Sequence, residues 1–423
     1  MTGEVITDAT ATETSTSEAA EAATLAERTE GWRDRYTDAM MLTFAPPRAL
    51  LVRGAGCYVW DENGTEYLDF LAGIAVNSLG HAHSEMVAAV SAQVGTLAHI
   101  SNYFASPSQI ELAERLKRIT GAGPAGRVYY CNSGAEANEA AFKLARLNIG
   151  SEPARPRTRI LSLHDSFHGR TMGALALSGK PAMRAPFLPV PGGVEHIHAT
   201  FEALEAAIDD TVSALFLEPV QGEAGVIDLP DGFLRRAREL CTRHGVLLIL
   251  DEVQTGAGRT GDWFAYQHDG ILPDAISIAK GIGGGVPIGA LVTFGETSEL
   301  FQRGQHGSTF GGNPLATTTA NTVLGIIERD GLVANAARRG EQLRDLILGF
   351  ESPHILEVRG RGLLLGIGLV EPVALKLADL ALAAGLIINA ANESTIRLAP
   401  PLIVGETELA EFGRRFGLAL ASL

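Results

Sequence analysis

Four short apolar runs in the chain are each followed directly by side chains that can react or bind a ligand. The runs are residues 127–131, 159–163, 246–250 and 274–279, and the segments after them are 132–136, 164–170, 251–254 and 280–285. Short apolar runs between helical stretches are typical of strands in a parallel sheet that is buried on both faces. Because ligands bind outside the carboxyl ends of such strands, we expect the four segments to meet at one site.

These segments contain the groups that a pyridoxal phosphate site needs. The amine of Lys280 can form a Schiff base, and the carboxylate of Asp251 can keep a pyridine nitrogen protonated so that the ring accepts electrons. Backbone N–H groups at the start of the helix after Ser133 can bind a phosphate. The ring of Phe167 can stack on a pyridine, and Arg170 can pair with a substrate carboxylate through two hydrogen bonds.

Nucleotide sites explain the same residues less well. The segment 256–261 fits the pattern G-x-G-x-x-G, but Asp262-Trp263 and a Pro273-Asp274 turn follow where a dinucleotide fold has a helix. Asp251-Glu252 could form a helix cap or bind Mg²⁺, but no Walker A sequence accompanies it. We therefore do not predict a nucleotide-binding protein.

A serine hydrolase and a metal site are also weakly supported. Ser133 does not lie in the G-x-S-x-G turn of the α/β-hydrolases. The pairs His81/His83 and His196/His198 lack a third ligand at a suitable spacing. We expect both pairs to be structural and predict no metal.

The periodicity of the chain predicts an α/β fold. The expected strands are 50–52, 58–60, 127–131, 159–163, 214–217, 246–250, 274–279, 288–294, 395–398 and a pair near 355–369. The expected helices are 83–98, 108–119, 136–148, long helices from about 315, and 406–421. This order predicts a large domain with a mostly parallel central sheet and a smaller α+β domain built from both chain ends.

The first 27 residues differ from the rest of the chain. They contain six acidic residues, no Lys or Arg and no aromatic residue, so they are expected to form a disordered acidic tail. We assign 28–82 and 315–423 to the small domain and 83–314 to the large, cofactor-binding domain.

Composition excludes several classes of partner. The formal net charge is −15, whereas binding to a phosphate backbone or an anionic membrane needs clustered positive charge. No apolar stretch is long enough to cross a bilayer. The cysteines are Cys57, Cys131 and Cys241, an odd number without C-x-x-C spacing, which favours the reducing cytoplasm over a disulfide framework.

Five motifs, taken together and in this order, resemble class III aminotransferases over the chain from about residue 35 to its end. They are Cys131–Asn138 (CNSGAEAN), Phe167–Arg170 (FHGR), Glu218–Glu223 (EPVQGE), Asp251–Gly256 (DEVQTG) and Gly307–Asn313 (GSTFGGN). The resemblance implies a pyridoxal-phosphate-dependent transferase of fold type I.

The resemblance also assigns roles to individual residues. Lys280 would carry the cofactor and move the proton, and Asp251 would pair with the pyridine N–H. The implied cofactor-binding residues are Ser133, Gly134, Ala135, Phe167, Asp251, Glu252, Val253, Gln254, Lys280 and Thr309. The implied substrate-binding residues are Arg170, Ser308, Glu223 and Arg397.

Two of these implied assignments concern the assembly and the choice of substrate. Thr309 would bind the phosphate from the neighbouring subunit, with Ser308 beside the substrate, so the resemblance implies a homodimer with shared active sites. Glu223 and Arg397 resemble a switch pair in which the glutamate covers the arginine for one substrate and uncovers it for dicarboxylic glutamate.

The segment Gly73–His81 resembles the branch of the family that acts on acetylornithine. The implied reaction is ping-pong transfer of the δ-amino group of N2-acetyl-L-ornithine to 2-oxoglutarate. Its products are N-acetyl-L-glutamate 5-semialdehyde and L-glutamate, in arginine biosynthesis. Relatives that use ornithine carry a tyrosine near Ile74, and an isoleucine suits an acylated, uncharged nitrogen. Ser84 stands where relatives commonly have proline, at a turn position without a catalytic role.

Alternative functions share most of these motifs. The donor could be ornithine, succinylornithine, succinyldiaminopimelate or 4-aminobutyrate. From another class, the chain could be a regulator that binds the cofactor without turnover, but such proteins usually add a basic DNA-binding module, which this acidic chain lacks.

Overall fold

The computed structural model describes residues 24, 25, 27–150 and 156–423. Most of the acidic tail predicted at 1–27 therefore lies outside the described residues. Thr24, Leu25 and Glu27, at its end, are helical, so the prediction of disorder was wrong for these three residues.

A seven-stranded sheet forms the centre of the larger part of the molecule. Its strands, in spatial order, are β4 (Arg127–Cys131), β12 (Gly289–Thr293), β11 (Ala275–Ile278), β10 (Leu247–Asp251), β7 (Val212–Leu217), β5 (Arg159–Leu163) and β6 (Val194–Ile197). All the strands run parallel except β12, which is antiparallel to both β11 and β4. The predicted mostly parallel sheet is therefore confirmed.

The sheet is apolar on both faces because helices cover both of them. Successive residues of a strand point to opposite faces. Leu248 and Leu250 of β10 belong to the apolar cluster that includes α10, whereas Leu247 and Ile249 belong to the cluster that includes α6. This arrangement explains why the strands are continuous apolar runs in the sequence.

The helices of this part are α4 (Ser84–Thr96), α5 (Pro107–Thr120), α6 (Gly134–Leu147), α7 (Met172–Leu177), α8 (Pro181–Arg184), α9 (Phe201–Ala207) and α10 (Phe233–His244).

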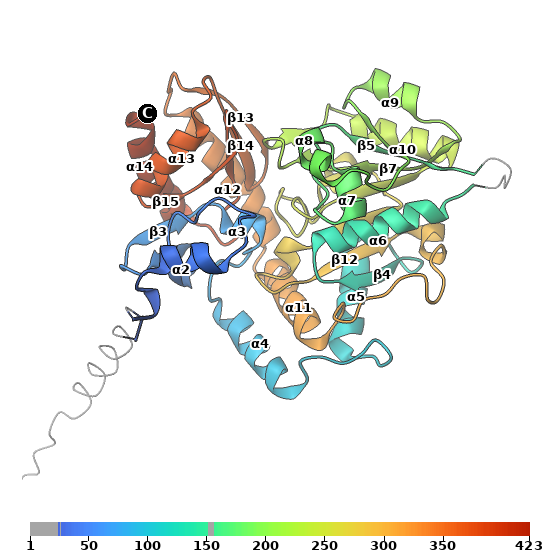
Figure 1. The fold of residues 1–423 in the computed structure, drawn as a ribbon, viewed down its shortest axis with the longest axis horizontal. Helices are drawn as coiled ribbons and strands as arrows, with labels where there is room; N and C mark the ends of the chain where they lie inside the picture. The colour runs from blue at the N-terminus through green and yellow to red at the C-terminus, as the bar shows by residue number, and fades with distance from the viewer. Residues whose placement is uncertain (1–23, 26, 151–155) are drawn as a thin grey trace, which may run out of the picture.

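The smaller part of the molecule contains two four-stranded sheets. One is β1 (Leu51–Ala55), β2 (Tyr58–Asp61), β3 (Glu66–Asp69) and β15 (Leu386–Ile387); the other is β13 (Ile355–Arg361), β14 (Leu364–Leu369), β17 (Thr395–Leu398) and β16 (Asn389–Asn392). Because β15 pairs with β3, the two ends of the chain share one sheet, and Figure 1 shows the blue and red segments side by side. The helices here are α2 (Trp32–Ala39), α3 (Ala72–Ala75), α12 (Leu332–Leu348), α13 (Ala374–Ala383) and α14 (Glu406–Ala421).

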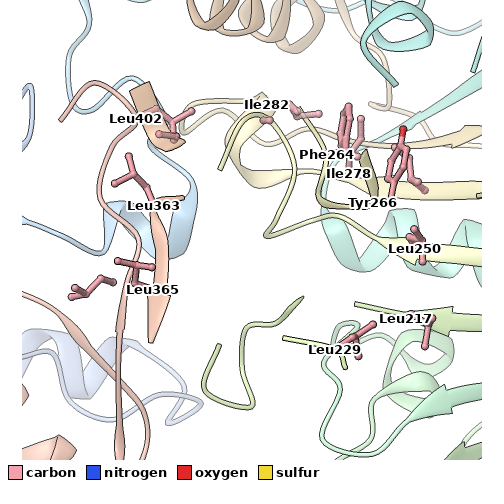
Figure 2. Close-up of a cluster of buried hydrophobic side chains, with 14 of the residues drawn as sticks. Leu217, Leu229, Leu250, Phe264, Tyr266, Ile278, Ile282, Leu363, Leu365 and Leu402 are labelled. Carbon is pink, nitrogen blue, oxygen red and sulfur yellow. The ribbon is translucent and has the colours of Figure 1, made fainter. Parts of the chain in front are cut away.

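The two parts share one continuous apolar cluster. Figure 2 shows Leu217 and Leu250 of the large sheet in the same cluster as Leu365 of β14 and Leu363, which directly precedes β14. The helix α11 (Pro314–Arg329) packs against α4 and α5 and also against α12. The domain boundaries at 28, 83 and 315 stay predictions, because α11 contacts elements on both sides of the last one.

Some elements were absent from the predicted set. They include the strands β3, β6, β15 and β16 and the helices α2, α3, α7, α8 and α13. The small hairpin of β8 (Val220–Gln221) and β9 (Ile227–Asp228), which connects β7 to α10, was also not predicted. Within the described residues, no helix is both long enough and apolar enough to cross a bilayer.

Candidate active site

A cavity of about 380 Å³ lies at the carboxyl ends of the parallel strands. Most of the residues predicted for the site line it, namely Ser133, Gly134, Ala135, Phe167, Glu223, Asp251, Val253, Gln254 and Lys280. The register explains part of this convergence, because β10 and β11 are parallel neighbours with Asp251 opposite Ser277. Asp251 and Lys280 therefore leave the sheet at the same edge.

Asp251 is the last residue of β10, and its carboxylate is buried. Its Oδ2 accepts hydrogen bonds from Asn138 Nδ2 at 2.7 Å and from His168 Nδ1 at 2.8 Å. Its Oδ1 accepts one from the N–H of Val253 at 3.0 Å. Oδ2 thus has two donors while Oδ1 has one, so the carboxylate is held in place and can accept a further hydrogen bond.

His168 and Asn138 are site residues that the sequence reasoning missed. Burial opposes protonation of His168, but the hydrogen bond and the charge of Asp251 outweigh burial and raise the pKa of the imidazole above its ordinary value. The only sequence signal for His168 was its position between Phe167 and Gly169, and Asn138 carried none beyond its place on the first turns of α6.

Lys280 follows β11 and begins a short 3₁₀ turn, Lys280–Ile282. Its backbone lies in the left-handed region, with φ 46°, where a side chain other than glycine is strained. The side chain is accessible only in part, through the cavity, and the protein packed around it desolvates the ammonium. This burial, and then the nearby charge of Arg397, lower the pKa of Lys280.

The helix α6 directs its N-terminus at the cavity. Ser133 is its N-cap, and its hydroxyl accepts a hydrogen bond from the N–H of Glu136 at 3.1 Å. The N–H groups of Gly134 and Ala135 belong to the first turn, which has no acceptors within a helix. A Cβ on Gly134 would lie 2.7 Å from Cγ1 of Val253, so only glycine lets α6 begin this close to the loop after Asp251.

Phe167 lies in the wall of the cavity, and its N–H donates to Oε1 of Glu218 at 2.8 Å. Glu218 also lines the cavity and is buried at the end of β7. Burial raises the pKa of its carboxyl to about 7. The sequence reasoning quoted Glu218 in a motif but gave it no role.

Glu223 and Arg397 form the ion pair that the resemblance implied. Glu223 Oε1 lies 2.5 Å from Arg397 Nη1, and Arg397 Nη2 donates to Asn389 Oδ1 at 2.8 Å. Burial would raise the pKa of Glu223, but the charge of Arg397 outweighs it and the pKa is lowered. Arg397 Nη1 also reaches Gln254 Oε1 at 3.4 Å, which ties the pair to the segment after Asp251.

Five predicted residues do not line the cavity. One of them is Arg397, which contacts the lining residues Glu223 and Gln254. Glu252 is buried and faces away, where its carboxylate accepts hydrogen bonds from the N–H of Tyr266 and from Thr255 Oγ1. Arg170 is exposed beside Phe167, with its Cζ 5.8 Å from the centre of the ring. Ser308 accepts from Asn132 Nδ2 at 3.3 Å, and Thr309 is exposed.

The residues of the cavity fit pyridoxal phosphate. The start of α6 offers free N–H groups for a phosphate, Asp251 offers an acceptor for a pyridine N–H, and Phe167 offers a ring face. Among the described residues, none accepts a hydrogen bond from the Lys280 ammonium, so the amine is available to an aldehyde. The same residues contain no grouping of three His, Cys, Asp or Glu side chains that could hold a metal ion.

The sequence and the fold both resemble known transaminases. The family described as aminotransferase class-III matches residues 43–420. The acetylornithine aminotransferase of Mycobacterium tuberculosis is 50% identical over 381 residues, which are 90% of this chain and 94% of that protein.

Two solved structures have the same fold. The ornithine aminotransferase of Toxoplasma gondii, described as having partial occupancy of PLP at its active site, gives a TM-score of 0.87. It shares 33% identity and covers 93% of this chain and 94% of its own. The N-acetylornithine aminotransferase of Stenotrophomonas maltophilia gives 0.78 with 38% identity, and covers 89% of this chain and 96% of its own.

Proposed function

The chain belongs to the class III aminotransferase family, and from that premise we propose that it transfers the δ-amino group of N2-acetyl-L-ornithine to 2-oxoglutarate. The products are N-acetyl-L-glutamate 5-semialdehyde and L-glutamate, in arginine biosynthesis. The observation that carries the proposal is the single cavity lined by Lys280, Asp251, the start of α6 and Glu223, which is paired with Arg397. The fold expected for the family, with its mostly parallel sheet, is confirmed.

Pyridoxal phosphate, when bound, supplies an aldehyde that takes up an amino group and a ring that accepts electrons from the substrate carbon. Lys280 moves a proton between the substrate carbon and the cofactor carbon. It can do so because desolvation and the charge of Arg397 increase the fraction of its amine that is neutral. Asp251 keeps the ring nitrogen protonated, and Asn138 and His168 hold the carboxylate for this task.

The remaining residues of the site bind and orient the cofactor and the substrates. The N–H groups of Gly134 and Ala135, with Ser133, hold the phosphate, and Phe167 stacks on the ring. The pair of Glu223 and Arg397 lets one site accept two substrates in turn. With the donor present, Glu223 neutralises Arg397; with 2-oxoglutarate or glutamate present, Glu223 moves away and Arg397 takes the second carboxylate.

Arg170, Ser308 and Thr309 belong to a site that we propose is completed by a second subunit. Thr309 is exposed in one chain, and the neighbouring side chains of Tyr103, Phe104 and Phe310 are 93%, 64% and 60% exposed. Large apolar groups with this exposure favour an interface. We propose a homodimer in which Thr309 reaches the phosphate of the partner's site. A cytoplasmic location fits the cysteines, which are free and buried.

The donor is tested by comparing kcat/KM for N-acetylornithine, succinylornithine, ornithine, succinyldiaminopimelate and 4-aminobutyrate, each with 2-oxoglutarate. Exposed Ile74 lies two residues before Val76, which lines the cavity, and an apolar side chain there suits an acylated nitrogen. We expect N-acetylornithine to be the best substrate by at least about tenfold, a difference of about 1.4 kcal/mol in transition-state binding. A preference for ornithine would contradict the proposal.

A further inference from the structure

The loop that carries Glu223 is held by side-chain hydrogen bonds to four of its five residues. It spans residues 222–226, between β8 and β9. Lys180 Nζ donates to the carbonyl of Glu223 at 2.7 Å, and Asn392 Nδ2 donates to that of Ala224 at 2.9 Å. The next two carbonyls, those of Gly225 and Val226, accept hydrogen bonds from Arg359. Four consecutive carbonyls, from Glu223 to Val226, are therefore each bound by a side chain from outside the loop.

Arg359, on β13, makes the largest contribution to this hold. Its Nε donates to the carbonyls of Gly225 at 3.0 Å and Val226 at 3.1 Å, and its Nη2 donates to Gly225 again at 2.8 Å. The guanidinium is itself positioned by Glu357 Oε1 at 2.6 Å and by Thr395 Oγ1 at 2.8 Å. The planar group of arginine is suited to several simultaneous hydrogen bonds of this kind.

The loop is also packed closely against the sheet of β13 and β14. A Cβ on Gly366 would lie 2.8 Å from the carbonyl oxygen of Gly225, and one on Gly360 would lie 2.8 Å from Cγ1 of Val226. Val226 is fully buried with φ 58°, a left-handed conformation that is strained for a β-branched residue. Such strain persists only where the surroundings hold the backbone in place.

Within this held loop, the Glu223 side chain retains freedom. It is 30% exposed, it lines the cavity, and its carboxylate pairs with Arg397 on β17. A glutamate that must cover Arg397 for one substrate and leave it for another needs a fixed backbone from which to rotate. If the backbone moved, the carboxylate would spend less time within hydrogen-bond distance of Arg397.

We propose that Arg359 is a positioning residue for substrate choice: by fixing the carbonyls of Gly225 and Val226, it sets how completely Glu223 covers Arg397. It thereby sets how well the site separates a donor with one carboxylate from dicarboxylic glutamate. The inference rests on the proposed function, because it assumes that Glu223 and Arg397 act as the switch. Arg359 contacts neither substrate nor cofactor and acts through Glu223.

The test uses the two half-reactions of the holoenzyme, followed by cofactor absorbance, with N-acetylornithine or L-glutamate as the amine. In Arg359→Met, which keeps the length of the side chain but loses its donors, the ratio of kcat/KM for N-acetylornithine to that for glutamate should fall roughly tenfold. Arg397 would be uncovered more often, so kcat/KM falls for N-acetylornithine and not for glutamate. An equal loss for both substrates indicates a structural role and overturns the inference.

Arg344→Met is the matched control. Arg344 also donates to carbonyls of β13, those of Val358 and Gly360, and within the described residues it makes no hydrogen bond to the loop. The substrate ratio should stay unchanged in this variant. If Arg359→Met does not fold, exposed Asn392→Ala releases the carbonyl of Ala224 instead and should lower the ratio about threefold; an unchanged ratio there overturns the inference.

Glu223→Gln separates this inference from the proposed function. It should lower the ratio by itself, and Arg359→Met should add nothing in the Glu223→Gln background, because the two residues act on one contact. If Glu223→Gln leaves the ratio unchanged, the switch itself is wrong. If Glu223→Gln lowers the ratio and Arg359→Met alone does not, the switch stands and the role of Arg359 is wrong.

Discussion

The ammonium of Lys280 is desolvated by the protein around it and lies in the field of Arg397, and both effects lower its pKa. A lysine with its ordinary pKa of 10.5 would be almost entirely protonated near neutral pH and could not take a proton. The carboxylates Glu223 and Asp251 act in the opposite direction and limit the shift. The same cavity therefore lowers the pKa of the base, Lys280, and contains the carboxylate of Asp251, which is proposed to face the ring nitrogen.

We expect Lys280→Ala to bind pyridoxal phosphate while losing amino transfer by a factor on the order of 10³, because the proton then has no carrier. The start of α6 and Asp251 remain to hold the cofactor. Gel filtration followed by the absorbance of bound cofactor measures the first property, and steady-state rates measure the second. Lys117→Ala, at a half-buried site on α5 that does not line the cavity, is the control. Turnover like that of the wild type in Lys280→Ala would refute the role.

Glu252 directly follows Asp251 in the sequence, but its side chain has a different role. Asp251 faces the cavity, whereas Glu252 is 1% exposed and faces Tyr266 and Thr255. Burial raises the pKa of its carboxyl from 4.5 to about 7. The folded protein therefore keeps this group protonated over a pH range in which the unfolded chain ionises it. The stability that it contributes is complete below about pH 4.5 and is lost as the pH rises through about 7.

Glu252→Gln should remove this pH dependence, because glutamine matches the shape and charge of the protonated acid. The melting temperature of the variant should exceed that of the wild type more at pH 8 than at pH 5.5. The shift in pKa corresponds to roughly 3 kcal/mol at most. Exposed Glu114→Gln serves as the control, with equal effects at both pH values. A difference that does not grow with pH, or loss of the cofactor, would contradict the placement of Glu252.

At the scale of elements, the start of α6 contributes both to the stability of the fold and to the proposed binding of the cofactor. Ser133 caps the helix through the N–H of Glu136 and also lines the cavity. Thr200 caps α9 in the same way, through the N–H of Ala203 at 3.2 Å, at an exposed site that does not line the cavity. The two caps are therefore matched in chemistry and differ in position.

Ser133→Ala and Thr200→Ala should each destabilise the protein by about 1 kcal/mol, the usual cost of losing an N-cap. Only Ser133→Ala should also weaken the binding of pyridoxal phosphate, by about threefold to tenfold, because it loses a hydrogen bond to the phosphate. Thermal melts and equilibrium dialysis measure the two effects. Equal cofactor affinity in both variants would show that α6 does not bind the phosphate.

At the scale of the whole molecule, one chain provides an incomplete site under our proposal. The segment Ser308–Phe310 does not line the cavity of its own chain, and the side chains of Thr309 and Phe310 are exposed. Its proposed destination is the cavity of a second copy. This arrangement would make activity depend on the dimer, because the phosphate would be held from both subunits.

Hybrid dimers test this arrangement. Lys280→Ala and Thr309→Asp should each be nearly inactive alone, the second because a carboxylate repels the phosphate. If Thr309 acts in the partner's site, a hybrid of the two variants contains one intact site. Random mixing of subunits after dissociation should then recover about a quarter of the wild-type activity, as expected for a symmetric dimer. No recovery, with hybrids verified by mass spectrometry, would place Thr309 in its own chain's site.

Elements whose interactions are mostly local were predictable. β4 and β5 have the predicted bounds, because each is a short, mostly apolar run and the turn after it carries polar residues. β6 was missed because its four residues mix apolar and polar side chains, and its conformation depends on pairing with β5. The antiparallel direction of β12 also went unpredicted, although the short connection from Ile278 to Gly289 contains no crossover helix.

The sequence by itself determined the chemical groups of the site, since Lys280, Asp251, Ser133 and Phe167 follow strands whose ends must share one edge of a sheet. Only the tertiary structure decided which groups support them. Asn138 and His168 lie 113 and 83 residues from Asp251 along the chain, and packing alone brings them to its carboxylate. The hydrogen bonds from Arg359 to the carbonyls of Gly225 and Val226 likewise connect segments that are far apart in the sequence. Local patterns record the conformation of the backbone, whereas hydrogen bonds between distant side chains form only when the whole chain has packed.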